Sequence, residues 1–310
     1  MDTLAKVHPP LTNAPLTNAP LTNAPFTNAP LTNAPLANAP LAAAHPHVRD
    51  AFITFVPEPH SYVITWPVSA AHAPAAPYTS VTTWLHSHFA AFDADAIICK
   101  MQSNSKTWPK SPYFGQTAAE IKAGWAAAGS AAAELGTLMH AQIEAFYNTV
   151  HNTVHNAEAD HASHASHASL SIEFQYFLQF HAASQQELTP YRTEWTVFHE
   201  EWRLAGSIDM VFTLPDGTLA IYDWKRAKEI KKSTAFGQYA QTPCISHLPD
   251  TNFWHYALQL NTYKAILETK YSKKVSRLCL VVLHPNQDTY KVWTVPDLSA
   301  EVQALMAERA

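Results

Sequence analysis

Hydrophobic and polar residues alternate along two segments that flank the short stretch Pro215-Asp216-Gly217. Alternation with a period of two is typical of β-strands, and three-residue connections with a left-handed glycine are common in β-hairpins. The pattern therefore predicts a β-hairpin over residues 205–228. Near its open end, two aspartates and one lysine occupy positions that are normally apolar.

The register of this hairpin brings two carboxylates together. If Leu214 faces Thr218 across the loop, Asp209 lies opposite Asp223, and Lys225 shares a face of its strand with Asp223. Like charges directly opposite each other in an antiparallel pair are destabilising. A cation between the carboxylates would remove that repulsion, and such oxygen ligands suit magnesium or manganese. The alternative is an edge hairpin with solvated charges.

The remaining periodic segments predict an α/β domain. Strands are predicted at 51–62, 191–198, 202–212, 275–283 and 289–295, and helices at 117–148, 170–182, 253–268 and 298–309. A further helix opens at Ser80, with Thr79 or Ser80 as its N-cap. Residues 100–112 are polar and typical of a loop. In the long helix, Leu135, Met139, Ile143 and Phe146 form the predicted apolar stripe, beside His140 and Glu144.

Two low-complexity segments differ from this pattern. The unit Leu-Thr-Asn-Ala-Pro repeats near the N-terminus, and a proline at every fifth residue blocks helices and sheets. We therefore expect a disordered tail over 1–48, with a partner-binding role as the alternative, and one folded domain over 49–310. A histidine-rich tract over 149–169 has the composition of an inserted loop, although its His-x-x-x-His spacing on a helix could also bind a metal ion.

Composition narrows the function classes. The chain has 310 residues, 47% of them hydrophobic, and a formal net charge of −5, so any site for a polyanion must be a local patch. Its three cysteines have no C-x-x-C pairing, which argues against a disulfide framework or a zinc finger. No apolar run is long enough to cross a membrane, and no secretory signal begins the chain. We expect a soluble intracellular protein of the cytoplasm or nucleus, with the mitochondrion left open.

The candidate chemistry is metal-assisted hydrolysis of a phosphodiester. Asp209 and Asp223 would hold the metal, and Lys225 would add positive charge near the water or the leaving oxygen. Glu194 lies on the strand before the hairpin, but no glycine or proline fixes that connection. The sequence places Glu194 near Asp209 and leaves open whether it shares the metal. A lone histidine such as His140 is, on its residues alone, more often structural than catalytic.

Five blocks occur in an order known from one group of enzymes: Ser80-Val81-Thr82, Gly136-Thr137-Leu138-Met139-His140, Gly206-Ser207-Ile208-Asp209, Asp223-Trp224-Lys225 and Gln259-x-x-x-Tyr263. In this the chain resembles the PD-(D/E)XK nuclease superfamily over about residues 52–300. It is most similar to the RecB-like and mitochondrial genome-maintenance exonuclease branch, which includes proteins of large DNA viruses. The resemblance implies a restriction-endonuclease-like core, with a central mixed β-sheet flanked by helices.

The resemblance also implies an activity, a Mg²⁺- or Mn²⁺-dependent DNA exonuclease or flap nuclease for single-stranded or frayed ends in replication, recombination or repair. Asp209, Asp223 and the Trp224 carbonyl would bind the metal, Lys225 would act on the water, and His140 would line the site. The implied DNA contacts are Gln259 and Tyr263, which could instead brace the site, together with Arg226, Lys228 and Ser80.

The implied partners are DNA and, for unwinding, a helicase or polymerase. No iron–sulfur cluster is expected, because the cysteine ligands of the cluster-bearing members are missing. Two alternatives remain: a catalytically idle protein of the same fold that binds DNA ends or acts as a scaffold, and a protein whose N-terminal repeats carry the function.

Overall fold

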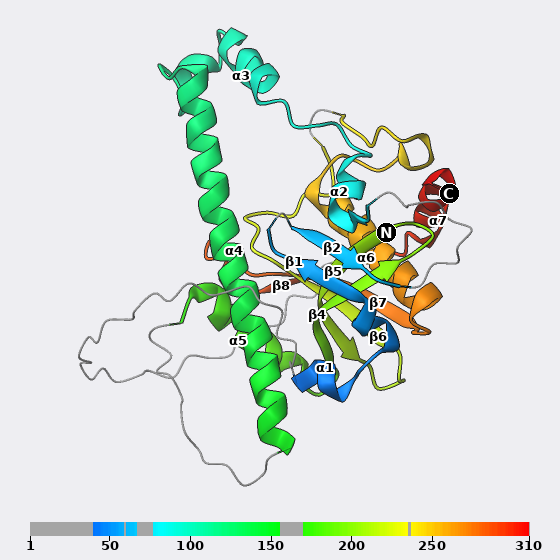
Figure 1. Cartoon of the computed structure of the whole chain (residues 1–310). Helices are drawn as coiled ribbons and strands as arrows, with labels where there is room; N and C mark the ends of the chain where they lie inside the picture. The colour runs from blue at the N-terminus through cyan, green and yellow to red at the C-terminus, as the bar shows by residue number, and fades with distance from the viewer. Residues whose placement is uncertain (1–39, 59, 67–76, 156–169, 235–236, 310) are drawn as a thin grey trace, which may run out of the picture.

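A six-stranded mixed β-sheet forms the centre of the protein, and helices cover both of its faces (Figure 1). The structure is a computed structural model that describes residues 40–58, 60–66, 77–155, 170–234 and 237–309. The strands of the sheet are β3 (Thr79–Ser80), β4 (Thr189–His199), β5 (Leu204–Thr213), β6 (Leu219–Lys225), β7 (Val275–Val282) and β8 (Lys291–Thr294). The predicted fold class, a mixed sheet flanked by helices, is confirmed.

The hairpin of β5 and β6 has the register that the sequence predicts. Leu214 N–H donates a hydrogen bond to the Thr218 carbonyl at 2.8 Å, and Gly217 has a φ of 80°, in the left-handed region that glycine adopts easily. The paired residues run from Thr213 opposite Leu219 to Met210 opposite Tyr222. The next facing positions in this register are those of the two aspartates.

Strand β5 changes partner along one edge, and this change leaves a gap in the ladder next to Asp209. Its other edge pairs with β4 along its whole length. On the edge that faces β6, residues 210–213 pair with β6, while Leu204 and Ala205 pair with the short parallel strand β3. Residues 206–209 therefore lie between the two partners, without a ladder on that edge. Strand β6 continues beyond this point in parallel pairing with β7.

Two hydrophobic cores hold the helices on the sheet. On one face, α2 (Val81–His86), α6 (Asn252–Lys270) and α7 (Ser299–Arg309) pack on Val211, Ile221 and Leu280. On the other face, α5 (Ile172–Ser184) and the second half of α4 (Ala118–His155) pack on Phe212, Trp224 and Val281. Strand side chains alternate between the two cores, as the period of two requires.

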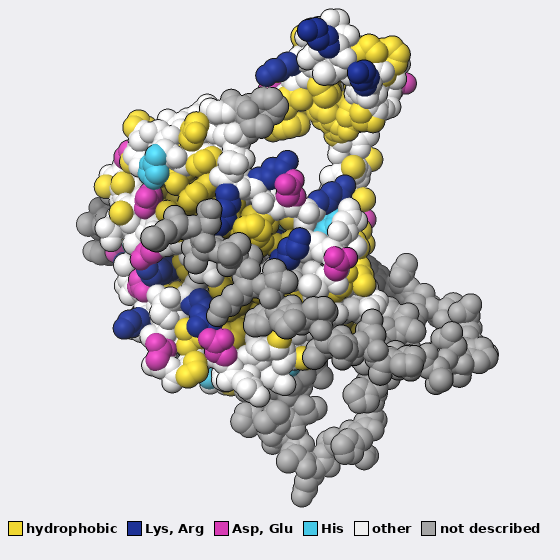
Figure 2. Space-filling view, turned by 180° about the vertical axis from the view of Figure 1, so that it is seen from behind, with side chains coloured by type: hydrophobic (Ala, Val, Ile, Leu, Met, Phe, Trp, Pro, Cys, Tyr) yellow, Lys and Arg dark blue, Asp and Glu magenta, His cyan; other side chains and the backbone are white. Residues whose placement is uncertain are grey.

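Helix α4 extends beyond the body of the protein as an arm. It has 38 residues, a length of about 57 Å at 1.5 Å per residue. Residues 126–135 are all exposed, while the start of the helix packs at the tip against α3 (Ala94–Ser103), next to the 3₁₀ turn η2 (Trp108–Lys110). Figure 2 shows an open space between this arm and the body, with hydrophobic side chains gathered on the tip.

Several sequence predictions need correction. Residues 51–62 are not one strand, because β1 (Ile53–Val56) and β2 (Ser61–Ile64) form a separate hairpin. Residues 94–103 form α3, which Asp93 caps. The sequence predicted no helix here and a polar loop from residue 100. Leu135 is 46% exposed, so of the predicted apolar stripe only the part from Met139 onward packs on the sheet.

The low-complexity segments lie largely outside the described residues. The repeats of residues 1–39 and residues 156–169 of the histidine-rich tract are not described. The described start of that tract continues α4 to His155. Packed structure begins before the boundary predicted after residue 48, with α1 (Pro40–Ala44) and η1 (Val48–Phe52), because Leu41 is buried. Within the described residues, no helix combines the length and apolar composition needed to cross a membrane.

Candidate active site

The two hairpin aspartates lie where β5 loses its pairing with β6. Asp209 ends the unpaired segment, and the Trp224 N–H donates a hydrogen bond to its Oδ2 at 3.0 Å. This side chain therefore takes the place of a backbone acceptor and holds the two strands together beyond the last ladder pair. Asp223, the residue before Trp224, is 3% exposed. The two aspartates thus lie on neighbouring strands, close enough for Asp209 to raise the pKa of Asp223.

His140 reaches the same position from α4. Its Nε2–H donates to the Trp224 carbonyl at 2.9 Å, while Nδ1 lies 3.6 Å from Asp209 Oδ2 and 3.7 Å from Glu194 Oε1. Burial alone would lower the pKa of His140, but the two carboxylates outweigh it and raise the pKa to about 9. His140 is therefore protonated at neutral pH when only these side chains surround it.

Glu194 lies next to Asp209, as the sequence predicts, and its share in a metal site stays a prediction. It faces Asp209 across the β4–β5 ladder, between the pairs Thr193–Met210 and Trp195–Ile208. Its φ of 41° lies in the left-handed region, which costs a residue with a Cβ about 1–2 kcal/mol.

Surrounding groups hold the Glu194 side chain in place. The Ser207 hydroxyl donates a hydrogen bond to Glu194 Oε2 at 2.9 Å. The ligand atoms of His140, Glu194 and Asp209 all lie within 4.8 Å of one another, close enough to share one ion. Backbone strain of this kind persists where the surrounding structure over-determines it, often at functional sites.

Asp223 and Lys225 form a buried ion pair. Lys225 Nζ lies 2.7 Å from Asp223 Oδ2. Burial raises the pKa of Asp223 to about 6 despite this partner, and burial likewise raises the pKa of Asp209. For Lys225, burial would lower the pKa, but the attraction of Asp223 and Asp209 raises it above its usual value. The lysine therefore keeps its proton at neutral pH.

The donor set fits a divalent cation such as Mg²⁺ or Mn²⁺. Carboxylate oxygens of Asp209, Asp223 and Glu194 are the hard ligands that these ions prefer. Asp223 Oδ2 already has one cationic neighbour, the Lys225 ammonium group at 2.7 Å. A buried carboxylate is costly unless it is paired, and a divalent ion would be a second cationic partner for this group.

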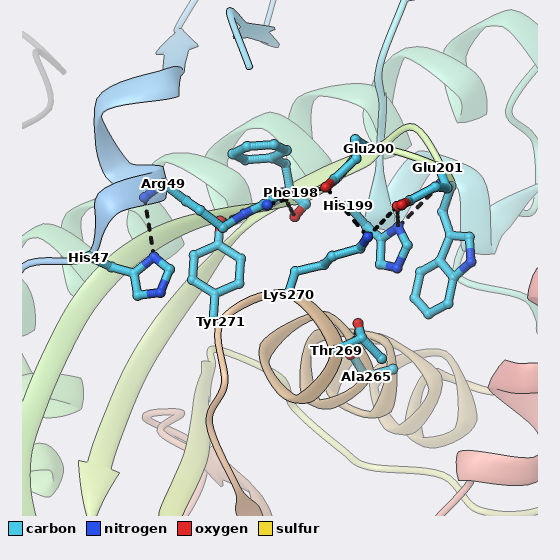
Figure 3. Close-up of polar contacts among 11 residues, drawn as sticks. His47, Arg49, Phe198, His199, Glu200, Glu201, Ala265, Thr269, Lys270 and Tyr271 are labelled. Carbon is cyan, nitrogen blue, oxygen red and sulfur yellow. Dashed lines mark hydrogen bonds and ion pairs between the residues drawn. The ribbon is translucent and has the colours of Figure 1, made fainter. Parts of the chain in front are cut away.

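A second cluster of histidine and glutamates has a structural arrangement instead (Figure 3). His199 ends β4, and Glu200 and Glu201 begin the turn to β5. Glu200 is ion-paired with Arg49, and Glu201 is ion-paired with Lys270, so both carboxylates already have cationic partners. Burial lowers the pKa of His199 to about 4 and keeps it neutral. These ion pairs connect the turn to η1 and α6.

The comparison with known protein families agrees with this geometry. A model of the PD-(D/E)XK nuclease superfamily matches residues 113–309, more than half of the chain. The chain belongs to the PD-(D/E)XK nuclease superfamily. No curated protein matches it. The match begins after the Ser80 block and extends beyond residue 300, whereas the resemblance was expected over about 52–300.

Two of the predicted DNA-binding residues of this superfamily member are buried beside the site. Gln259 is 8% exposed and Tyr263 is 3% exposed, and their side chains are hydrogen-bonded to each other on α6. A Cβ on Gly206 would lie only 2.6 Å from the Tyr263 hydroxyl oxygen, so Tyr263 packs directly on the β5 backbone. For Tyr263, this packing favours a bracing role over contact with DNA.

The other predicted DNA contacts of this PD-(D/E)XK protein differ in accessibility. Ser80 is the N-cap of α2, and its hydroxyl accepts a hydrogen bond from the Thr83 N–H at 3.1 Å. Arg226 pairs with Glu173, with Nε 2.7 Å from Oε1. Lys228 is exposed. Of these residues, only Lys228 has no described partner that would compete with a phosphate.

Two residues near the site have no role in the sequence prediction. Lys225 Nζ lies 4.7 Å above the ring centre of Tyr256, which is one turn before Gln259 on α6. Glu144, one turn after His140, has a pKa that burial and Glu194 raise to about 7. The helical spacing from His140 and Gln259 could have indicated both, but no residue pattern assigned them a role.

Proposed function

We propose that this superfamily member is a divalent-metal-dependent deoxyribonuclease that hydrolyses phosphodiester bonds at single-stranded or frayed DNA ends. The observation that carries the proposal is the gathering of Asp209, Glu194 and His140 at the break in β5–β6 pairing, with the Asp223–Lys225 ion pair on the neighbouring strand. Two buried carboxylates with raised pKa values favour the arrival of a cation. A scaffold protein has no use for this costly arrangement.

The site residues take separate roles in this proposal. Asp209 and Asp223 would hold Mg²⁺ or Mn²⁺, with Glu194 as a further carboxylate ligand. The Trp224 carbonyl accepts a hydrogen bond from His140 and keeps a second lone pair for a metal. When bound, the ion lowers the pKa of water and offsets the negative charge that builds on the phosphate.

Lys225 supplies fixed positive charge. Because the pKa of Lys225 is raised, the side chain remains an ammonium group at neutral pH and cannot act as a base. It can donate a hydrogen bond to the attacking water or to a phosphate oxygen, which stabilises charge that develops during the reaction. The hydrogen bond from His140 Nε2–H to the Trp224 carbonyl holds the imidazole ring so that its Nδ1 faces Asp209.

Cleavage of end-labelled single-stranded DNA tests the proposal. We expect Mg²⁺-dependent cleavage that a chelator stops, and a loss of at least about 100-fold in Asp209→Ala or Lys225→Ala, the size typical of removing a key electrostatic group. The control is Asp288→Asn, because Asp288 is an exposed aspartate outside the site. Cleavage by Asp209→Ala at the wild-type rate would refute the assignment.

An idle protein that only binds DNA ends is the alternative, and the same assay separates the two. The idle protein would retain labelled ends in a filter-binding experiment with Mg²⁺ and leave them uncut. We also propose that the enzyme is an exonuclease of the RecB-like, mitochondrial genome-maintenance branch, acting in replication, recombination or repair. Circular single strands test that part, because an exonuclease leaves them intact.

A further inference from the structure

A small pocket lies beside Lys225, on the face of the sheet that α2 and α6 cover. Its volume is about 160 Å³. Lys225 belongs both to this pocket and to the ion pair with Asp223. Any group in the pocket would therefore be adjacent to the candidate metal site. The lining residues are Thr82, Leu85, His86, Lys225, His255, Tyr256 and Gln259.

Three of the seven lining residues have flat rings. The His86 and His255 ring centres lie 5.5 Å apart, and Tyr256 presents its ring to the Lys225 ammonium group at 4.7 Å. Rings of histidine and tyrosine are surfaces on which unpaired nucleobases stack. Thr82 and Gln259 add polar groups that could reach the edge of a base.

The ring of His255 is held in position before any ligand binds. Its Nε2 lies 2.9 Å from Asp250 Oδ1, and its ring centre lies 4.0 Å from that of Phe89. A ring that is fixed by two contacts loses little freedom when a base stacks on it, so less affinity is lost to ordering. His86, at the end of α2, is exposed and forms the outer wall.

The charges of the pocket favour a base over a phosphate. Lys225 is its only lysine or arginine, and this ammonium group is already ion-paired with Asp223. Burial lowers the pKa of His255 and keeps this ring neutral at physiological pH. Phosphate sites in proteins are built from several cationic or N–H donors directed at the oxygens. The lining here is mostly ring and aliphatic surface instead.

We propose that this pocket holds the nucleobase of the nucleotide that adjoins the scissile phosphate. The inference rests on the proposed nuclease function and adds a substrate requirement to it: an unpaired base beside the cut. A base that enters the pocket leaves its duplex stack, which explains why single-stranded or frayed ends would be preferred. The shared Lys225 sets the distance between this base and the reacting phosphate.

Oligonucleotides with one abasic nucleotide test the proposal. In single-stranded substrates with the abasic position moved along the strand, we expect KM to rise about tenfold when it adjoins the cut, since one base stack has roughly this value. His86→Ala should raise KM for the unmodified strand by a similar factor. It should have no further effect on the abasic strand, because the contact is already missing.

Two further variants keep the result interpretable. Thr82→Trp places a ring at the exposed rim and should raise KM for the unmodified strand more than for the abasic strand. His247→Ala, an exposed histidine that pairs with Glu301, is the control and should leave KM unchanged for both.

The outcomes separate this inference from the proposed function. Equal KM values for unmodified and abasic strands at every position would overturn the base pocket while cleavage continues. If His86→Ala raises KM by the same factor for both strands, the base pocket is also overturned, because His86 would then only support Lys225. If the wild-type protein cleaves no strand at all, the proposed function itself has failed.

Discussion

Glu194 carries the clearest backbone strain in the site, and its cost can be measured. Its φ of 41° is unfavourable for any residue with a Cβ but not for glycine. We expect Glu194→Gly to be more stable than Glu194→Ala by about 1 kcal/mol in urea unfolding. Both variants should bind Mn²⁺ more weakly than the wild type, as measured by calorimetry. If the alanine variant is as stable as the glycine variant, the backbone at this position is not strained.

Gly206 is the residue that allows Tyr263 to approach the site. A Cβ at this position would lie 2.6 Å from the tyrosine oxygen and 2.7 Å from a ring carbon, too close for any contact without a shift. We expect Gly206→Ala to lower the free energy of unfolding by roughly 1–3 kcal/mol, the usual effect of overpacking. Urea unfolding measures this change. Combining it with Tyr263→Ala should recover part of the loss, and independent, additive effects would contradict the predicted clash.

At the scale of elements, the turn between β4 and β5 links folding to pH. His199 is neutral in the folded protein because burial lowers its pKa to about 4, whereas an unfolded histidine titrates near 6.5. The unfolded chain therefore binds more protons between these values, and this contribution to stability is present above pH 6.5 and lost as the pH falls toward 4.

The His199→Phe variant tests this link, because phenylalanine keeps a ring for stacking on Trp202 and cannot titrate. Between pH 6.5 and 4.5 we expect the wild type to lose on the order of 1 kcal/mol more stability than this variant, after allowance for solvent screening. Chemical unfolding at each pH measures the difference. The control His247→Phe alters an exposed histidine and should retain the wild-type slope.

The exposed middle of α4 depends on helix propensity more than on packing. Residues 126–135 are all exposed, and Gly129 has open space where a Cβ would stand. Because alanine is favoured over glycine in a helix by about 1 kcal/mol, Gly129→Ala should slow amide exchange there about fivefold. Unchanged exchange rates would mean that contacts, and not propensity, maintain this part of the arm.

For the molecule as a whole, the sequence predicts most reliably what short-range patterns determine. The β5–β6 register follows from Pro215-Asp216-Gly217, and the α2 cap follows from Ser80. Long-range contacts decide the rest. Arg49 and Lys270 clamp the β4–β5 turn from distant elements, and this turn determines where Glu194 lies. The helix of the arm was predicted, but its exposure was not, since an Ala-rich helical sequence looks the same whether or not another element packs on it.

Metal binding should stabilise the whole domain, because the two hairpin carboxylates are held together only in the folded chain. A ligand that binds only the folded state adds about 2.7 kcal/mol of stability at 100 times its Kd. Tm should therefore rise with Mn²⁺ concentration for the wild type and for the Asp288→Asn control, and return to its starting value with chelator. In Asp223→Asn the rise should be lost, because the amide removes one of the buried carboxylates that would hold the ion. An equal rise in this variant would place the metal away from the β5–β6 break, even if DNA cleavage required a cation.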